Sequence, residues 1–313
     1  MAVLHNRISN KELRLRLFSE NISRITVSFY KYFSINNPKN FRDKLYYHLN
    51  TLKVFGRIYV SHEGINAQVS VPDFLYKEMK FFIYNLDTSL NNLHMNISLD
   101  NNSKSFWALR IKVRDRIVSD GLKDNIFNIS KVGTYVEVEE VNEMINDPEV
   151  TIVDIRNSYE YEIGHFETAI KIPYNTFREQ LHKVIEILKN YKNEKIVLYC
   201  TGGIRCEKAS AWMIYNGFKQ VYQIRGGIIE YVNYARKKNL PIMFKGKNFV
   251  FDQRMSETVS KDILSYCHQC KEPNDFYVNC ANDSCHKLFI QCAYCRTKFS
   301  KCCSLKCQNH LIK

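Results

Sequence analysis

Hydrophobic and polar positions in the first third of the chain alternate with two periods, one typical of strands and one typical of helices. Runs rich in β-branched and aromatic residues predict strands at residues 24–32, 54–60, 65–71, 93–99 and 106–113. Apolar residues three to four positions apart predict helices over 38–52 and 72–86. The order β-α-β-β-α-β with an extra strand predicts a ferredoxin-like (split βαβ) domain over residues 1–125.

A regular alternation of strand and helix patterns follows a polar stretch, 120–133, that we interpret as a linker. Apolar runs predict short strands at 151–155, 170–173, 196–199 and 221–224. Helical patterns lie between and after them, at 177–188, from about 207 to 216, and at 228–238. Strands separated by helices imply a mainly parallel sheet. We therefore expect a parallel α/β domain over residues 126–244, connected by 245–262 to a Cys-rich tail.

Composition narrows the class of protein. The 313 residues are too many for one core, and 45% hydrophobic with 25% charged residues is typical of globular domains. No run approaches the ~18 apolar residues of a membrane helix, and residues 1–20 carry scattered charges where a signal peptide has an apolar core. We therefore expect a cytoplasmic protein without a membrane segment. The net charge of +13 favours an anionic partner such as RNA, although a codon bias toward Lys and Asn would also raise it.

Cysteine usage indicates a metal module at residues 245–313. Nine of the eleven cysteines lie between Cys267 and Cys307, which in a reducing compartment indicates metal binding rather than disulfides. The pairs Cys267-x2-Cys270 and Cys292-x2-Cys295 have the spacing of a four-thiolate Zn²⁺ site. A second, interleaved site is predicted from Cys280, Cys285, Cys303 and Cys307, with Cys302 unassigned and with His268 and His286 as possible substitutes. One or two zinc ions would be structural, since no vacant position or neighbouring base is evident.

The segment from Cys200 to Arg205 has the features of a reactive-thiol loop. It lies between a predicted parallel strand and the next helix, where open α/β sheets bind ligands. Its two glycines let backbone N–H groups point inward, and the helix N-terminus and Arg205 add positive charge. We expect Cys200 to be a thiolate exposed at the edge of the sheet, with a lowered pKa. Its predicted anion-binding neighbours are Thr201, Gly202, Gly203 and Ile204.

Loop size favours sulfur chemistry. Four residues separate Cys200 from Arg205, one fewer than in Cys-based phosphatases.

Other roles are open for the residues around the loop. Cys200 could instead be a buried structural thiol, and Cys206 is either a resolving thiol or a residue that only fills space in the core. Glu207 is expected to complement the helix N-terminus. Three further residues are expected to be structural: Asp154 and Arg156 as an ion pair, and His165 through packing.

The loop resembles that of a rhodanese domain, in which such a Cys carries a persulfide. Asp154-Ile155-Arg156, Glu160-Tyr161, Gly164-His165, Ala169, Ile172-Pro173 and Gly226-Gly227 carry the same resemblance. Over essentially the whole length, the chain resembles the rhodanese-related tRNA uridine hydroxylases. The segments that carry this wider resemblance are Ser61 to Ala67, Lys112 to Arg114, Cys200 to Lys208, and Phe249 to Asp252 before the Cys-rich tail.

This resemblance implies a central rhodanese-like domain and an activity. The family converts the wobble uridine of certain tRNAs to 5-hydroxyuridine with molecular oxygen, and its essential Cys matches Cys200. The sequence has no flavin or haem motif. The anticodon loop of tRNA would be the partner, and Lys112, Arg114 and Arg116, which alternate along the last predicted strand, are candidate RNA contacts. The wobble base would leave its stack to reach Cys200.

Three functions remain open at this point. A hydroxylase could use Cys200 as a thiolate that adds to C6 of uracil, or as a persulfide. A rhodanese-type sulfurtransferase would instead pass sulfur from a Cys200 persulfide to RNA or a carrier protein. A non-catalytic RNA-binding adaptor would keep the zinc module and leave the loop inert. The electron donor, the tRNA species and the oligomeric state are not predicted.

Overall fold

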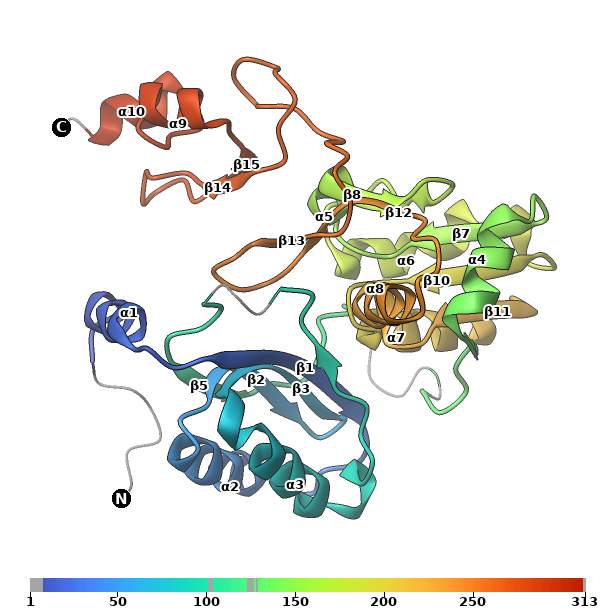
Figure 1. Cartoon of the computed structure of the whole chain (residues 1–313). Coiled ribbons are helices and arrows are strands. Elements are labelled where there is room, and N and C mark those ends of the chain that lie inside the picture. Colours follow the sequence, from blue (N-terminus) through green and yellow to red (C-terminus); the bar gives the residue numbers. More distant parts are fainter. Residues whose placement is uncertain (1–7, 101–103, 123–126, 128, 312–313) are drawn as a thin grey trace.

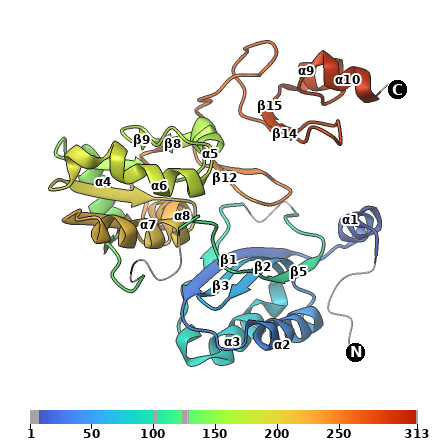
Figure 2. The same cartoon turned by 180° about the vertical axis from the view of Figure 1, so that it is seen from behind.

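The computed structural model of the chain describes residues 8–100, 104–122, 127 and 129–311. Both views of the chain place the N-terminal domain, a central domain and the Cys-rich module at three corners of a triangle (Figures 1 and 2). A helix that the sequence analysis did not predict, α1 (Asn10–Ser19), precedes the N-terminal domain. Within the described residues, no helix has the length and apolar character needed to cross a membrane.

The N-terminal domain has the predicted ferredoxin-like fold. Its elements are β1 (Arg24–Tyr32), α2 (Pro38–Thr51), β2 (Phe55–Ser61), β3 (Gly64–Pro72), α3 (Tyr76–Leu86), β4 (Asn96–Ile97) and β5 (Leu109–Val113). The sheet order is β4-β1-β3-β2-β5, in which only β5 pairs in parallel, with β2. Because side chains alternate along a strand, each strand turns one set inward and the other outward.

The two faces of this sheet differ in what covers them. Helices α2 and α3 cover one face (Figure 1), and Leu45, Leu49, Met79 and Ile83 from these helices are fully buried in the core there. The opposite face carries polar and aromatic side chains, and several of them line a cavity shared with the central domain. The N-terminal domain therefore presents an open sheet face to the site described below.

The central domain is a parallel five-stranded α/β sheet in the order β6-β11-β10-β7-β9. Its strands are β6 (Thr134–Val136), β7 (Val150–Asp154), β9 (Ile170–Lys171), β10 (Lys195–Tyr199) and β11 (Gln220–Ile224). Its helices are α4 (Val138–Asn146), α5 (Ser158–Ile163), α6 (Phe177–Ile187), α7 (Ile204–Tyr215) and α8 (Gly227–Lys238). Helices α6 and α7 contribute to one core cluster and α4 and α8 to the other, so both faces are covered. The parallel sheet agrees with the sequence pattern, which did not predict β6, α4 or α5.

Two segments expected to be linkers contribute described residues to the folded domains. Asp120, at the start of the 120–133 stretch, is fully buried, and its charge is paired with the buried Lys208. The segment after residue 243 begins with β12 (Phe244–Phe249), which pairs with β8 (Gly164–Phe166) of the central domain and with β13 (Ser256–Thr258). The connection to the Cys-rich module is therefore part of a small antiparallel sheet.

The Cys-rich module is small and has little regular structure. It contains β14 (Tyr277–Asn279), β15 (Leu288–Ile290), α9 (Ala293–Lys298) and α10 (Leu305–Leu311). Tyr277 anchors it to the central domain, since its hydroxyl hydrogen-bonds to the Tyr159 carbonyl at 2.8 Å and to Glu162 at 3.1 Å. Lys247 of β12 pairs with Asp275 of the module at 2.7 Å.

Candidate active site and metal centres

The thiol loop begins where β10 ends and closes on α7. Helix α7 starts at Ile204, three residues before the predicted position near Glu207, and Gly203 is its N-cap with φ +102°. A Cβ atom at Gly203 would lie 2.9 Å from the Tyr30 hydroxyl oxygen, so both the backbone conformation and the space require glycine. The Gly203 N–H donates a hydrogen bond to Cys200 Sγ at 3.1 Å.

The environment of Cys200 favours the thiolate. Complete burial by itself would raise its pKa. The hydrogen bond from the Cys206 thiol, the Arg205 charge and the N–H groups of residues 205 and 206 outweigh burial and lower the pKa to about 5. Burial, together with the hydrogen bond to Cys200, raises the pKa of Cys206 well above its ordinary value. Cys206 is therefore a protonated thiol that donates to its neighbour.

The expectation that Cys200 is exposed at the sheet edge is wrong. Its exposed fraction is 0%. The expectation followed from the parallel sheet alone, whereas the open face of the N-terminal sheet and the segment around Phe251 also border the cavity on which Cys200 lies. Cys200 also packs in the core of the central domain with Leu198, Cys206 and Ala209, and this burial strengthens the electrostatic interactions around it.

Arg205 is held by a buried carboxylate that the motif alone did not pair with it. Its guanidinium forms a two-pronged ion pair with Glu160 of α5, with Nη–Oε distances of 2.5 and 2.9 Å. Burial would lower the pKa of Arg205, but the Glu160 charge outweighs it and raises that pKa. Arg205 Nη2 also donates to Thr201 Oγ1 at 3.2 Å. The ion pair with Glu160 and the hydrogen bond to Thr201 hold Arg205 and the loop in one conformation.

The three residues expected to be structural have structural partners. Arg156 and Asp154 form a buried ion pair at 2.7 Å, and Arg156 also donates to the Gly164 carbonyl at 2.5 Å. The His165 ring stacks on Tyr161 with 3.8 Å between centroids. Burial lowers the pKa of His165. None of these residues lines the cavity around Cys200.

A cavity of about 900 Å³ joins the thiol loop to the open face of the N-terminal sheet. Its volume is within the range of small-molecule sites. The N-terminal side chains that line it include Ser28, Tyr30, Arg57, Tyr59, Asn66 and Gln68. The central domain contributes Cys200, Thr201, Gly202, Tyr135, Glu207 and Arg225. Sequence reasoning did not single out the N-terminal residues as a site, because their alternating polarity is that of any half-exposed sheet.

A charge network fixes α7 against the N-terminal domain. Lys208, one turn after the loop, is 1% exposed and pairs with Asp120 at 2.5 Å and with Glu63 at 2.8 Å. Arg116 joins the same network, 3.3 Å from Asp120. The Tyr32 hydroxyl donates to the Ile204 carbonyl at 3.2 Å. These contacts align the open sheet face with the loop.

Two of the three predicted RNA contacts remain on the surface. Lys112 is an exposed residue of β5, in register with Tyr59 of β2. The expectation that all three basic residues alternate along one strand is wrong, because β5 ends at Val113. Arg114 is exposed beyond the end of β5, and Arg116 turns back into the network with Asp120.

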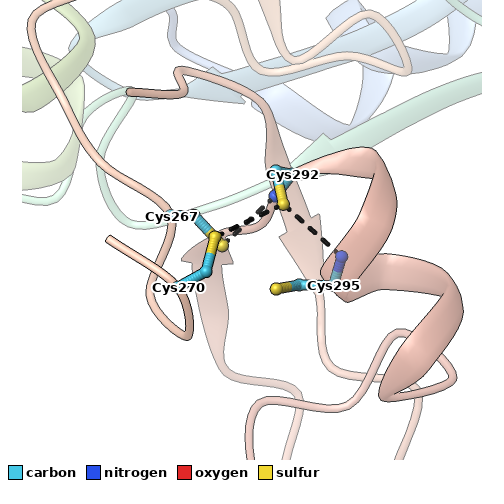
Figure 3. Close-up of side chains that lie close together, drawn as sticks. All are labelled: Cys267, Cys270, Cys292 and Cys295. Atoms are coloured by element: carbon cyan, nitrogen blue, oxygen red, sulfur yellow. Dashed lines mark hydrogen bonds between the residues drawn. The ribbon is translucent and has the colours of Figure 1, made fainter. Parts of the chain in front are cut away.

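Eight of the nine tail cysteines fall into two groups of four that could each hold a metal ion. Cys267, Cys270, Cys292 and Cys295 form one group (Figure 3), and Cys280, Cys285, Cys303 and Cys307 form the other. Within each group the sulfur atoms lie within 4.8 Å of one another. The groups alternate along the chain, as the spacing predicted, while Cys302 and both candidate histidines lie outside them.

Backbone N–H groups point at several of these sulfurs, as suits thiolate ligands. The Cys292 N–H donates to Cys267 Sγ at 3.4 Å, and the Cys295 N–H donates to Cys292 Sγ at 3.4 Å. Burial would raise the pKa of Cys267, but hydrogen bonds from the N–H groups of Cys292, Cys270 and Gln269 lower it to about 6. Four convergent thiols with such donors fit a tetrahedral metal ion.

Comparison with known proteins covers the whole chain. Three family models match successive segments: "UPF0176 acylphosphatase like domain" over residues 24–117, "Rhodanese-like domain" over 137–234 and "Rhodanase C-terminal" over 245–308. The tRNA uridine(34) hydroxylase of Erwinia tasmaniensis is 58% identical over 99% of this chain and 89% of its own length. Proteins of the same name from an Enterobacter species and from Buchnera aphidicola are 55% and 57% identical, over 100% and 98% of this chain and 89% and 94% of their own lengths.

Proposed function

This chain belongs to the tRNA uridine(34) hydroxylase family, and we propose that it hydroxylates the wobble uridine of tRNA to 5-hydroxyuridine at Cys200. The observation that carries the proposal is the ionised Cys200 on a cavity of about 900 Å³, in a chain that matches hydroxylases along its full length. Thr201, Gly202, Gly203 and Ile204 form the anion-binding turn, and Arg205 holds it closed.

The chemistry follows from the uracil ring and a thiolate. C6 of uracil is conjugated to the C4 carbonyl, so addition of Cys200 Sγ at C6 makes C5 an enolate carbon. C5 can then attack molecular oxygen, with one oxygen atom kept on C5. The other oxygen atom leaves as water at the expense of two electrons from an external reductant. Loop N–H groups and the charge of Arg205 favour the anionic thiolate. The same N–H groups and the same charge would stabilise a persulfide on Cys200.

The anticodon loop of tRNA is the proposed partner, and the cytoplasm the proposed location. The wobble base leaves its stack and enters the cavity between the two domains. Tyr30 and Tyr59 on the open sheet face offer aromatic surface, and Lys112 and Arg114 lie exposed at the parallel edge of that sheet. Arg116 is the weakest of the three basic candidates because its charge is already paired.

Two structural zinc ions are proposed for the Cys-rich module, one in each group of four cysteines. The buried clusters in the described part of the module are small: one lies around Val278, Cys280 and Phe289, and in another Tyr277 and Ile290 pack on Ile163. Metal binding would therefore supply much of the folding free energy of the module. The Tyr277 hydrogen bond and the Lys247–Asp275 ion pair connect the folded module to the central domain.

The sulfurtransferase and adaptor alternatives are not favoured. The relatives that match along the whole chain are named hydroxylases, and the rhodanese-like match alone covers only residues 137–234. An adaptor would not need an ion-paired Arg205 and a thiolate on the wall of a cavity.

Nucleoside mass spectrometry tests the function directly. A strain lacking this gene should lose 5-hydroxyuridine from its tRNA, and the wild-type chain should restore it, whereas Cys200→Ser should not. Loss of a thiolated nucleoside instead would favour sulfur transfer, and full activity of Cys200→Ser would favour the adaptor. RNA containing 5-fluorouracil should trap an adduct on Cys200, and failure to trap it with active enzyme would count against the covalent route.

A further inference from the structure

Two tyrosines and a carboxylate lie together on the wall of the cavity that holds Cys200. Tyr135, in β6 of the central domain, donates to Glu207 Oε2 at 3.0 Å. The hydroxyl of Tyr30, in β1 of the N-terminal domain, lies against Gly203, whose carbonyl accepts the Glu207 N–H at 3.1 Å, and interaction with the Glu207 carboxylate contributes to the raised pKa of Tyr30. All three side chains line the cavity together with Cys200. The sequence predicted only a helix-end role for Glu207, which leaves these two phenol partners unexplained.

Tyr30 lies between the thiol loop and Glu207. A Cβ atom at Gly203 would come within 2.9 Å of the Tyr30 hydroxyl oxygen, so this oxygen touches the loop that holds Cys200. Burial, followed by the nearby charge of Glu207, raises the pKa of Tyr30 well above its ordinary value, and the Cys200 charge adds to this effect. The hydroxyl is therefore a protonated group with a carboxylate partner on one side and the reactive loop on the other.

Hydroxylation through a Cys200 adduct needs a base at its last step. After oxygen is delivered, C5 of the uridine carries a hydrogen and a hydroxyl group, and C6 carries the Cys200 sulfur. To restore the uracil ring, the C5 proton must leave while the C6–S bond breaks. The electrons of the C5–H bond form the C5=C6 double bond, and those of the C6–S bond return to Cys200. A thiol whose pKa is about 5 is a good leaving group, and this step consumes no oxidant or reductant.

We propose that Tyr30 and Glu207 form the proton relay for this elimination, an assignment that rests on the proposed hydroxylation. The Tyr30 oxygen takes the proton from C5 while its own proton passes to the Glu207 carboxylate. Tyr135 is a positioning residue that holds the carboxylate toward Tyr30. Arg205 cannot serve as this base, because it is a permanent cation paired with Glu160. The N-terminal domain thus contributes a catalytic residue to the site of the central domain.

Two readouts in the strain lacking this gene test the relay. The full chain is expressed as wild type, Tyr30→Phe, Glu207→Gln, Glu207→Asp, Tyr135→Phe or Cys200→Ser. The initial rate of 5-hydroxyuridine formation is measured by mass spectrometry, and covalent protein–tRNA adducts are measured on denaturing gels. Loss of a general base typically costs about 10²-fold or more in rate. We expect this loss in Tyr30→Phe and Glu207→Gln, with accumulation of an adduct on Cys200, because the ring can no longer eliminate the sulfur.

The remaining variants serve as matched controls. Glu207→Asp keeps a carboxylate and should retain more activity than Glu207→Gln, and Tyr135→Phe should lose less than tenfold. Cys200→Ser should form no adduct. Melting temperature and tRNA binding identify any variant that fails to fold. If Tyr30→Phe fails to fold, the comparison of Glu207→Asp with Glu207→Gln tests the relay instead. The relay is overturned if Tyr30→Phe or Glu207→Gln keeps the wild-type rate, or if a folded, tRNA-binding variant loses product without accumulating adduct. A wild-type chain that restores no 5-hydroxyuridine contradicts the hydroxylation itself.

Discussion

At the scale of single residues, the Cys206 thiol is a hydrogen-bond donor to the Cys200 thiolate. A hydrogen bond to a charged group contributes about 1.5–3 kcal/mol, so its loss should raise the pKa of Cys200. Cys206→Ala removes the donor, while Cys206→Ser keeps an O–H donor at the same place. We expect the alkylation rate of Cys200 to have its midpoint near pH 5 in the wild type and in Cys206→Ser, and at clearly higher pH in Cys206→Ala.

The same pair of variants separates two roles of Cys206. A resolving thiol requires sulfur, so both variants would lose activity equally if Cys206 formed a disulfide during turnover. If donation is its role, hydroxylation at pH 6 falls in Cys206→Ala and stays close to wild type in Cys206→Ser. Equal loss in both variants would contradict the assignment of Cys206 as a donor.

Residue partners that are distant in the sequence were the hardest part of the site to predict. The Cys200 loop was predicted because its glycines, its arginine and its place after a buried strand are local features. Glu160 lies 45 residues before Arg205, and in the sequence it stands out only as part of a family pattern. Tyr30 was not singled out, because one tyrosine in a strand has no signal that tells a catalytic role from packing.

At the scale of elements, the turn into α8 supports the thiol loop. Gly227 has φ +66°, and a Cβ atom there would lie 2.4 Å from the Cys200 carbonyl oxygen and 2.7 Å from that of Thr201. The N–H of Ile228 donates to the Cys200 carbonyl at 3.0 Å. We expect Gly227→Ala to cost several kcal/mol, because it adds a backbone clash to the ~1–2 kcal/mol of left-handed strain, and to abolish hydroxylation.

Gly217 is the matched control for this prediction. Its φ is +89°, but a Cβ atom there would meet only the tip of Lys192 at 4.0 Å. Gly217→Ala should therefore cost only the conformational strain of about 1–2 kcal/mol and keep the activity. Urea denaturation of the two variants measures the difference. Equal stability losses would mean that close approach to the loop is not what requires glycine at position 227.

The Cys-rich module depends on its metal ligands rather than on its helices and strands. With both groups of four cysteines occupied, metal analysis of the purified chain should find two zinc ions per chain. Cys295→Ser should lose one of them and become sensitive to proteolysis between residues 263 and 311, while Cys302→Ser should keep both, since Cys302 lies outside both groups. Equal zinc loss in the two variants would contradict the grouping, as would removal of zinc by a chelator without loss of protection from proteolysis.

At the scale of the whole molecule, sequence patterns predicted domains better than they predicted how domains meet. The ferredoxin-like order and the parallel sheet follow from local periodicity, so both were predictable. The joint lining of the cavity by both domains and the pairing of Lys208 with Glu63 depend on how one domain packs against another. Such contacts join residues far apart in the chain, and neither period nor composition encodes them. For the same reason, the predicted linker at residue 120 is partly buried.

The contact between domains decides which basic residues are available to tRNA. A contact with a single-stranded phosphate contributes about 0.7 to the slope of log binding constant against log salt. Lys112→Ala should lower this slope by about that amount and weaken tRNA binding, because Lys112 is exposed on β5. Arg116→Ala should leave the slope unchanged and lower the free energy of unfolding instead, since Arg116 pairs with Asp120 and Glu63. Filter binding from 50 to 300 mM salt and urea denaturation measure the two effects. An equal drop in slope for both variants would show that Arg116 leaves its carboxylates to bind RNA, and that the domains shift when tRNA arrives.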